Sequence, residues 1–210
     1  MVESRSPTSK NQLRAALLRK RRELTQQRRD NEAQALNCWL PGLAQRGQTV
    51  CAYVPVGSEP GSPALLDTLL NLDVRVLLPI ARNDDGVPRP LRWGGYRPGT
   101  LVAAAFGLRE PPPPWLPPET IGEADLVLVP ALAVDRSGAR LGRGAGFYDR
   151  TLGWAAPGAR LVAVVRDDEL LDELPAEPHD VRMTHALTPA GGLVALGPAR
   201  DANIEDAAGK

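Results

Sequence analysis

The segment of the sequence best suited to chemistry follows an apolar run at residues 125–129 and combines arginines with glycines. Its arginines are Arg136, Arg140 and Arg143, and its glycines are Gly138, Gly142, Gly144 and Gly146. Glycine lets the backbone approach a ligand closely, its N–H groups can converge on phosphate oxygens, and arginine adds paired donors. The segment therefore predicts a phosphate-binding loop. Its GxGxG spacing is neither a Walker A nor a dinucleotide-binding motif, so a purely structural turn is the alternative.

The elements that must hold this loop are indicated by apolar runs that alternate with helical patterns. Strands are expected over residues 49–54, 74–78, 125–129 and 160–165. Helices are expected over residues 10–46, with Ser9 or Thr8 as the cap and a break within the polar residues 25–34, and then over 62–72 and 147–154. The last of these would place Asp149 in a first turn, where the helix dipole attracts anions.

The middle of the chain, residues 80–120, is rich in proline and glycine, and we expect surface loops there with short edge strands near residues 91–93. The alternation elsewhere predicts an α/β fold with a mostly parallel sheet covered on both faces. Ligands of such sheets bind at the carboxyl ends of the strands. We expect one domain over residues 1–198 and a disordered tail over residues 199–210.

The charge of the chain offers no general attraction to an anionic partner, because 25 basic residues balance 25 acidic ones. Residues 1–30 are an exception, with nine basic against three acidic residues, and this end could face phosphates or simply be a solvated helix face. A nucleic-acid-binding module is a further reading, but no known motif accompanies the charge and aromatic residues make up only 4% of the chain. We expect no nucleic-acid partner.

The compartment is indicated by what the sequence lacks. The two cysteines, Cys38 and Cys51, form no CxxC pair and have no neighbouring histidine, so neither a disulfide framework nor a zinc site is expected. The first ten residues contain no apolar signal segment, and no apolar run approaches the roughly 18 residues that span a bilayer. We expect a cytoplasmic protein without a membrane partner.

The glycine-rich segment, with its preceding strand, closely resembles a motif of 5-formyltetrahydrofolate cyclo-ligases, also called methenyltetrahydrofolate synthetases, which reads D-x-x-G-x-R-L-G-x-G-x-G-[YF]-Y-D. The matching residues are Asp135, Gly138, Arg140, Leu141, Gly142, Gly144, Gly146, Tyr148 and Asp149. The resemblance extends to the segments KNQLR, YVPVGSE, LLP, GLREP and LPAEPHD, and so covers about residues 10–190.

This resemblance implies a three-layer α/β/α fold similar to the sugar-phosphate isomerase and CoA-transferase-like superfamily. It also implies an ATP- and Mg²⁺-dependent ligase that converts 5-formyltetrahydrofolate, free or polyglutamylated, to 5,10-methenyltetrahydrofolate with release of ADP and phosphate. The formyl oxygen would be phosphorylated to an iminium phosphate before the ring closes. We expect a monomer or a weak homodimer. A related protein that only binds nucleotide or folate in a regulatory role is the alternative.

Site residues follow from the resemblance position by position. Nucleotide would be bound by Lys10, Arg14, Arg140, Leu141, Gly142, Arg143, Gly144, Ala145, Gly146, Phe147 and Tyr148, with Lys10, Arg140 and Arg143 acting in catalysis. Folate would be bound by Val54, Glu59, Arg143, Gly144, Ala145, Gly146 and Phe147, with Trp93 as a further candidate. Mg²⁺ would be bound by Asp149 and Asp180.

Alternative readings accompany several of these residues. Glu59 could be a solvated carboxylate, Asp180 a turn residue and Trp93 a core residue. The chain also departs from the family, which often has lysine at the position of Ala145, tyrosine at Phe147 and glutamine at Glu169. In this chain, therefore, no lysine side chain at position 145 and no tyrosine hydroxyl at position 147 can take part in the chemistry of the loop.

Overall fold

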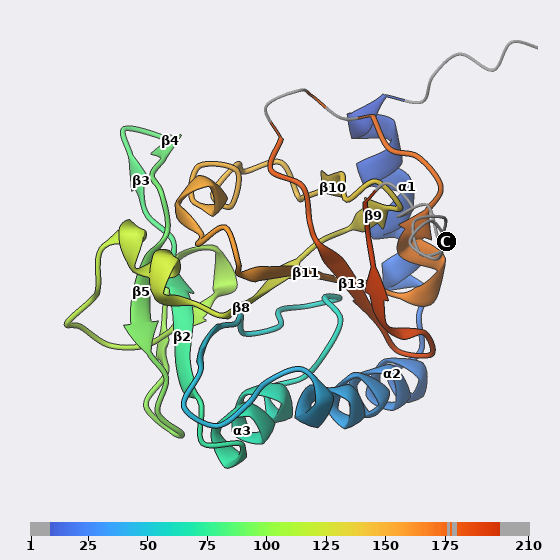
Figure 1. Ribbon diagram of the computed structural model, residues 1–210. Coiled ribbons are helices and arrows are strands. Elements are labelled where there is room, and N and C mark those ends of the chain that lie inside the picture. The colour runs from blue at the N-terminus through green and yellow to red at the C-terminus, as the bar shows by residue number, and fades with distance from the viewer. Residues whose placement is uncertain (1–8, 176, 178–179, 198–210) are drawn as a thin grey trace, which may run out of the picture.

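The computed structural model describes residues 9–175, 177 and 180–197, and its centre is a seven-stranded sheet in the order β14-β13-β11-β8-β1-β2-β5 (Figure 1). In chain order the strands are β1 (Thr49–Cys51), β2 (Arg75–Ile80), β5 (Arg92–Gly95), β8 (Leu126–Pro130), β11 (Arg160–Val164), β13 (His185–Thr188) and β14 (Gly192–Ala195). The inner five are mutually parallel, and the two edge strands, β5 and β14, are antiparallel to their neighbours. The predicted α/β class with a mostly parallel sheet is confirmed. The likeness to the superfamily stays a prediction.

The central strands are apolar because the sheet is covered on both faces. In β8, Leu126 and Val129 are fully buried, and the two residues between them are 1% exposed. The predicted strands have the right positions but not always the right ends: β1 stops at Cys51, and β2 continues through Pro79. Proline is tolerated there because β1 has already ended, so at that point β2 pairs with the edge strand alone.

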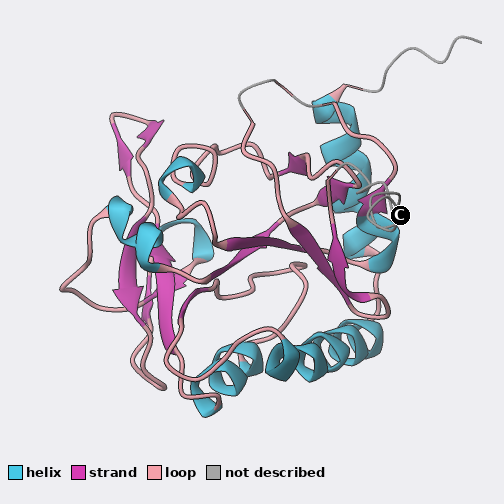
Figure 2. Ribbon diagram, viewed as in Figure 1, coloured by secondary structure: helices cyan, strands magenta, loops and turns pink. Residues whose placement is uncertain are grey.

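One face of the sheet packs against two α-helices, α2 (Gln26–Trp39) and α3 (Ala64–Asn71), which run below the sheet in Figure 2. Leu36 of α2 and Leu65 of α3 are fully buried in the same cluster as Val50 of β1. The opposite face is covered by two 3-10 segments, η3 (Pro118–Glu123) and η4 (Leu152–Trp154), and by connecting chain. The second outer layer therefore lacks the α-helix expected over residues 147–154.

The prediction of a helix over residues 147–154 was wrong, because Thr151 uses its backbone amide and its hydroxyl in hydrogen bonds that favour a turn. Residues 147–151 form turns, and the amides of Thr151 and Leu152 both donate to the carbonyl of Tyr148. The Thr151 hydroxyl donates to the Phe147 carbonyl over 2.8 Å and accepts from the Leu91 amide over 2.8 Å. A side chain that takes part in local backbone bonds competes with a helix. Asp149 therefore lies in a turn.

Helix α1 (Lys10–Arg22) packs against a small three-stranded sheet of β9 (Ala133–Asp135), β10 (Arg140–Leu141) and β12 (Leu170–Leu171). Leu17 shares a buried cluster with Leu132 and Leu141 there. Ser9 caps α1, as predicted, but the break before α2 covers only residues 23–25 and most of the polar run is helical. This packing brings the basic start of α1 to the glycine-rich loop.

Short elements complete the fold. They are η1 (Leu40–Gly42), β3 (Asn83–Asp84), β4 (Val87–Pro88), β6 (Val102–Ala103), η2 (Ala105–Gly107), β7 (Arg109–Glu110) and η5 (Asp167–Glu169). The expected edge strand near residues 91–93 is β5. In the part of the chain described, no helix is both long and apolar enough to cross a bilayer. The tail predicted over residues 199–210 lies outside the described residues.

Candidate active site

A cavity of about 360 Å³ opens at the carboxyl ends of three adjacent parallel strands. Tyr53 and Val54 line it beyond β1, Ala81 beyond β2, and Pro130 and Ala131 at the end of β8. The glycine-rich loop forms another wall, so the site lies where ligands of parallel sheets are expected. We call this space the large cavity, because more residues line it than line the neighbouring cavity.

The glycine-rich loop owes its shape to a buried carboxylate. Asp135 is 2% exposed, and its side chain accepts hydrogen bonds from the amides of Ser137, Ala139 and Leu174, each over 2.9 Å, and from the Ser137 hydroxyl over 2.6 Å. Gly138 follows with a φ of +88°, and a β-carbon there would lie 2.3 Å from the Met183 carbonyl oxygen. The sequence motif contains Asp135, but only these contacts show that it anchors the loop.

A second cavity, more open to solvent and lined by fewer residues, lies between the start of α1 and the same loop, and we call it the charged cavity. Its lining includes Lys10 and Arg14 of α1 and the carboxylates Asp149, Glu177 and Asp180. Arg14 donates to the Gly142 carbonyl over 3.0 Å, which ties α1 to the loop. Gly144 and Asp149 line both cavities, so the loop is the wall that separates them.

Cations and carboxylates of the site are paired with one another. Lys10 lies 3.0 Å from Glu177 and 3.5 Å from Asp180. Burial acts to lower the pKa of Lys10, but these two carboxylates outweigh it and the pKa is raised. Arg140 pairs with Asp149. A triphosphate bound with a divalent cation would suit this arrangement, since phosphate oxygens could take over the cations and the metal the carboxylates.

The expected Mg²⁺ ligands fit such an ion. Asp149 and Asp180 line the same cavity with side chains 58% and 23% exposed, which leaves room for water. Among the described residues no three His, Cys, Asp or Glu side chains cluster as a metal cage. Mg²⁺ requires no such cage, because it keeps several waters and commonly binds one or two carboxylates together with substrate phosphates.

Two buried polar atoms point to a ligand in the large cavity. The Nε of Arg140 and the hydroxyl of Tyr148 have no hydrogen-bond partner among the described residues, and both residues line the cavity. The Arg140 guanidinium lies 5.7 Å from the centre of the Tyr148 ring. Burial, aided by the charge of Glu59, raises the pKa of Tyr148, so its phenol stays protonated and can donate. A buried donor without a partner is costly, and a polar ligand would relieve that cost.

Glu59 also faces the large cavity. Its side chain is 11% exposed, lies 3.2 Å from Arg143, and accepts from the Val56 amide over 3.0 Å. Burial raises the pKa of Glu59, and the Val56 hydrogen bond and the Arg143 charge only partly offset that rise. The structure thus places a partly desolvated carboxylate opposite the glycine loop rather than a solvated one.

Most of the predicted site residues meet at these two cavities. The loop residues that line the large cavity are Arg140, Gly142, Arg143, Gly144, Ala145, Gly146, Phe147, Tyr148 and Asp149, together with Val54 and Glu59. Two predicted residues line neither cavity. Leu141 is buried in the cluster under α1, and Trp93 is fully buried with its indole N–H donating to the Pro118 carbonyl. The folate contact expected of Trp93 is therefore corrected to a core role.

Several lining residues were not singled out from the sequence. Arg150 lines the charged cavity and donates to the Gly146 carbonyl over 3.0 Å, and its place directly after Asp149 was an available signal. Arg21 and Arg109 line the large cavity. Arg21 is one of four consecutive basic residues, and nothing in that run indicates which of them is buried.

Comparisons with known proteins give one consistent family. The family model described as the 5-formyltetrahydrofolate cyclo-ligase family matches residues 6–189. A 5-formyltetrahydrofolate cyclo-ligase of Mycolicibacterium smegmatis is 74% identical over 91% of this chain and 99% of its own length. The Escherichia coli protein of the same name is 29% identical over 68% of this chain and 78% of its own.

Solved structures show the same fold. The structure of 5,10-methenyltetrahydrofolate synthetase from Aquifex aeolicus superposes with a TM-score of 0.75, at 25% identity, over 95% of this chain and 97% of that one. A 5,10-methenyltetrahydrofolate synthetase from Mycoplasma pneumoniae superposes with a TM-score of 0.61 over 83% and 95% of the two chains. At 21% identity the second likeness supports the fold alone.

Proposed function

Because this chain belongs to the 5-formyltetrahydrofolate cyclo-ligase family, we propose that it converts 5-formyltetrahydrofolate to 5,10-methenyltetrahydrofolate and cleaves ATP to ADP and phosphate. The observation that carries the proposal is the shared wall between the two cavities. One cavity is mostly apolar and the other is charged, and Gly144 and Asp149 belong to both. Two substrates held on opposite sides of one loop could meet across it.

The charged cavity suits the triphosphate. Lys10, Arg14 and Arg150 supply cations there, and the glycine loop can direct backbone N–H groups at phosphate oxygens. Asp149 and Asp180 would hold Mg²⁺, which when bound would neutralise the phosphate charge that builds up during transfer. Positioning and charge neutralisation are the main demands of phosphoryl transfer, and this set of side chains is suited to both.

The large cavity suits the folate. Its apolar walls at Val54, Leu91 and Phe147 would bury the pterin, and the Glu59 carboxylate could accept hydrogen bonds from pterin N–H groups. Arg140 and Tyr148 present their unpaired donors to the same space. These donors could hold the formyl group next to the loop.

The chemistry proceeds in two steps. The formyl oxygen attacks the γ-phosphorus, the bond from that phosphorus to ADP breaks, and N5 carries an iminium phosphate. N10 then adds to the activated carbon and loses its proton, and the carbon–oxygen bond breaks to release phosphate. Arg140 and Arg143 lie where they could stabilise the charge on the transferring group. No covalent bond to the protein is required.

A coupled assay tests the proposal. Purified protein is mixed with 5-formyltetrahydrofolate, ATP and Mg²⁺, and the near-ultraviolet absorbance of the methenyl product is followed together with phosphate release. We expect one phosphate for each product formed and no reaction when ATP is omitted. A rate unchanged by EDTA would contradict the role given to the metal, and the absence of product would contradict the proposed activity.

A further inference from the structure

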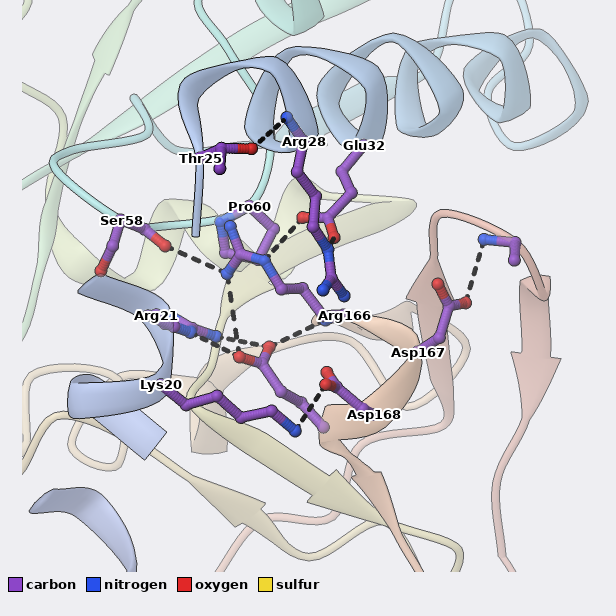
Figure 3. A network of polar contacts seen from close by, with 12 residues as sticks. Lys20, Arg21, Thr25, Arg28, Glu32, Ser58, Pro60, Arg166, Asp167 and Asp168 are labelled. Atoms are coloured by element: carbon purple, nitrogen blue, oxygen red, sulfur yellow. Dashed lines mark hydrogen bonds and ion pairs between the residues drawn. The ribbon is translucent and has the colours of Figure 1, made fainter. Parts of the chain in front are cut away.

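Four consecutive residues after β11 hold three other parts of the protein, namely α1, α2 and the turn between β13 and β14, and we call them the clamp segment, residues 166–169 (Figure 3). The Asp167 carboxylate accepts from the amides of Ala190 and Gly191 in the turn between β13 and β14. Asp168 pairs with Lys20 of α1 over 2.6 Å. These two contacts are exposed and lie away from the cavities. The other two side chains of the segment are buried.

Glu169 is the centre of the buried contacts. Its carboxylate accepts two hydrogen bonds from Arg21, over 2.6 and 2.7 Å, and one from the Arg166 amide over 2.8 Å. The Arg166 guanidinium lies 3.7 Å from the same carboxylate. Side-chain exposure is 1% for Arg21, 4% for Arg166 and 3% for Glu169. Burying a charged group is costly unless it is paired and hydrogen-bonded, so each of these three depends on the others.

Hydrogen bonds from the two arginines link this network to the walls of the large cavity. Arg21 donates over 2.6 Å to the carbonyl of Ala131, which lines the cavity at the end of β8. Arg166 donates over 3.1 Å to the carbonyl of Ser58, the residue before Glu59, and pairs with Glu32 of α2 over 2.7 Å. Figure 3 shows the two guanidinium groups lying between α1, α2 and the loop that contains Ser58.

We propose that Glu169 is a positioning residue for the folate-binding cavity: by orienting Arg21 and Arg166, it fixes the backbone at Ala131 and Ser58 and thereby places Glu59. This inference rests on the proposed function for the identity of the ligand. Glu169 does not line the cavity and acts only through the two arginines. Its loss leaves Arg21 and Arg166 without their shared counterion, and the two walls are then free to shift.

The charged cavity is much less dependent on Glu169. Lys10 lies eleven residues before Arg21 on α1, about 16 Å along the helix at 1.5 Å per residue. Arg14 is held separately by the Gly142 carbonyl, and α1 packs on the small sheet through Leu17. A change at Glu169 should therefore weaken folate binding more than nucleotide binding, which a general loss of stability would not do.

The test compares Glu169→Gln with Asp168→Asn, a matched control that removes a charge from the same segment and an ion pair to the same helix. Binding of 5-formyltetrahydrofolate without nucleotide, and of Mg²⁺–ATP without folate, is measured by calorimetry well below the melting temperature of each variant. We expect Glu169→Gln to raise the Kd for 5-formyltetrahydrofolate about tenfold and that for Mg²⁺–ATP less than about threefold, while Asp168→Asn changes neither by more than about twofold.

Hydrogen exchange supplies a second readout that requires no ligand. The Val56 amide is bonded to Glu59 and the Glu59 amide to Val56, and both should exchange faster in Glu169→Gln than in Asp168→Asn. If Glu169→Gln does not fold, Arg166→Lys replaces it, because lysine keeps the charge but cannot reach Glu32, Glu169 and the Ser58 carbonyl together.

Three results would overturn the inference: an unchanged folate Kd in the folded variant, equal weakening of both ligands, or unchanged exchange at Val56 and Glu59. Failure of the wild-type protein to bind 5-formyltetrahydrofolate would instead overturn the proposed function and the ligand named here. The two failures are therefore distinguishable.

Discussion

Replacing Asp149 by asparagine separates a metal-binding role from a structural one. The Asp149 side chain is 58% exposed and pairs with Arg140, and Asn keeps an oxygen that can accept from that arginine. Solvent screens this ion pair at Asp149, and asparagine leaves Arg140 a hydrogen-bond acceptor, so the expected loss of stability is about 1 kcal/mol. For a chain of this length 1 kcal/mol corresponds to about 2–4 °C in melting temperature, so the variant should melt within about 4 °C of wild type.

The loss of a metal ligand should instead appear as weaker stabilisation of the variant by Mg²⁺–ATP. Mg²⁺–ATP at about 100 times its Kd stabilises the folded state by about 2.7 kcal/mol, which raises the melting temperature of the wild type by about 5–11 °C. If Asp149→Asn weakens binding about tenfold, the same concentration contributes about 1.4 kcal/mol, or about 3–6 °C. The variant should also require more Mg²⁺ for half-maximal rate, and its activity should fall sharply.

The assay is a melting curve with and without Mg²⁺–ATP, together with a Mg²⁺ titration of the rate. Asp172→Asn is the control, because its carboxylate is 99% exposed and pairs with Arg136 over 3.4 Å outside both cavities. Equal ligand-induced shifts in wild type and Asp149→Asn, with an unchanged Mg²⁺ requirement, would refute the metal role. A large loss of stability without ligand would show that Asp149 is structural.

Further predictions concern the two cavities. Arg140→Ala and Arg143→Ala should each lower kcat/KM by about 10²-fold or more in initial-rate assays, because each removes a charged donor. Near-normal rates would show that these arginines have no role in catalysis. Lys10→Met should raise the KM for ATP at least about tenfold, whereas Lys20→Met on the same helix should not. Because burial raises the folded-state pKa of Glu59 above its unfolded value, the folded protein binds this proton more tightly, and stability falls as pH rises through the interval between the two values. Glu59→Gln should therefore melt higher than wild type at neutral pH, with the difference vanishing below both pKa values, while its folate binding weakens.

The alternation of apolar runs with helical patterns was sufficient to predict the fold class. Strands with both faces buried must be apolar along their whole length, as β8 is, and this signal can be read locally. The order of the strands and the 3-10 covering of one face could not be read in this way. The segment 147–154 has a helical pattern, but the bonds of Thr151 to Phe147 and Leu91 decide its shape, and Leu91 is sixty residues away in the chain.

The site, like the fold, could be predicted only in part from the sequence. The motif from Asp135 to Asp149 is contiguous, so the sequence by itself identified the loop, its family and the loop residues that line the cavities. Only the tertiary structure decided that Trp93 is a core residue and that Arg21 and Glu169 form a buried pair. These roles depend on partners distant in sequence, 148 residues apart for Arg21 and Glu169. A local pattern records which side chains are available, whereas burial and charge pairing are set by the neighbours that folding brings to them.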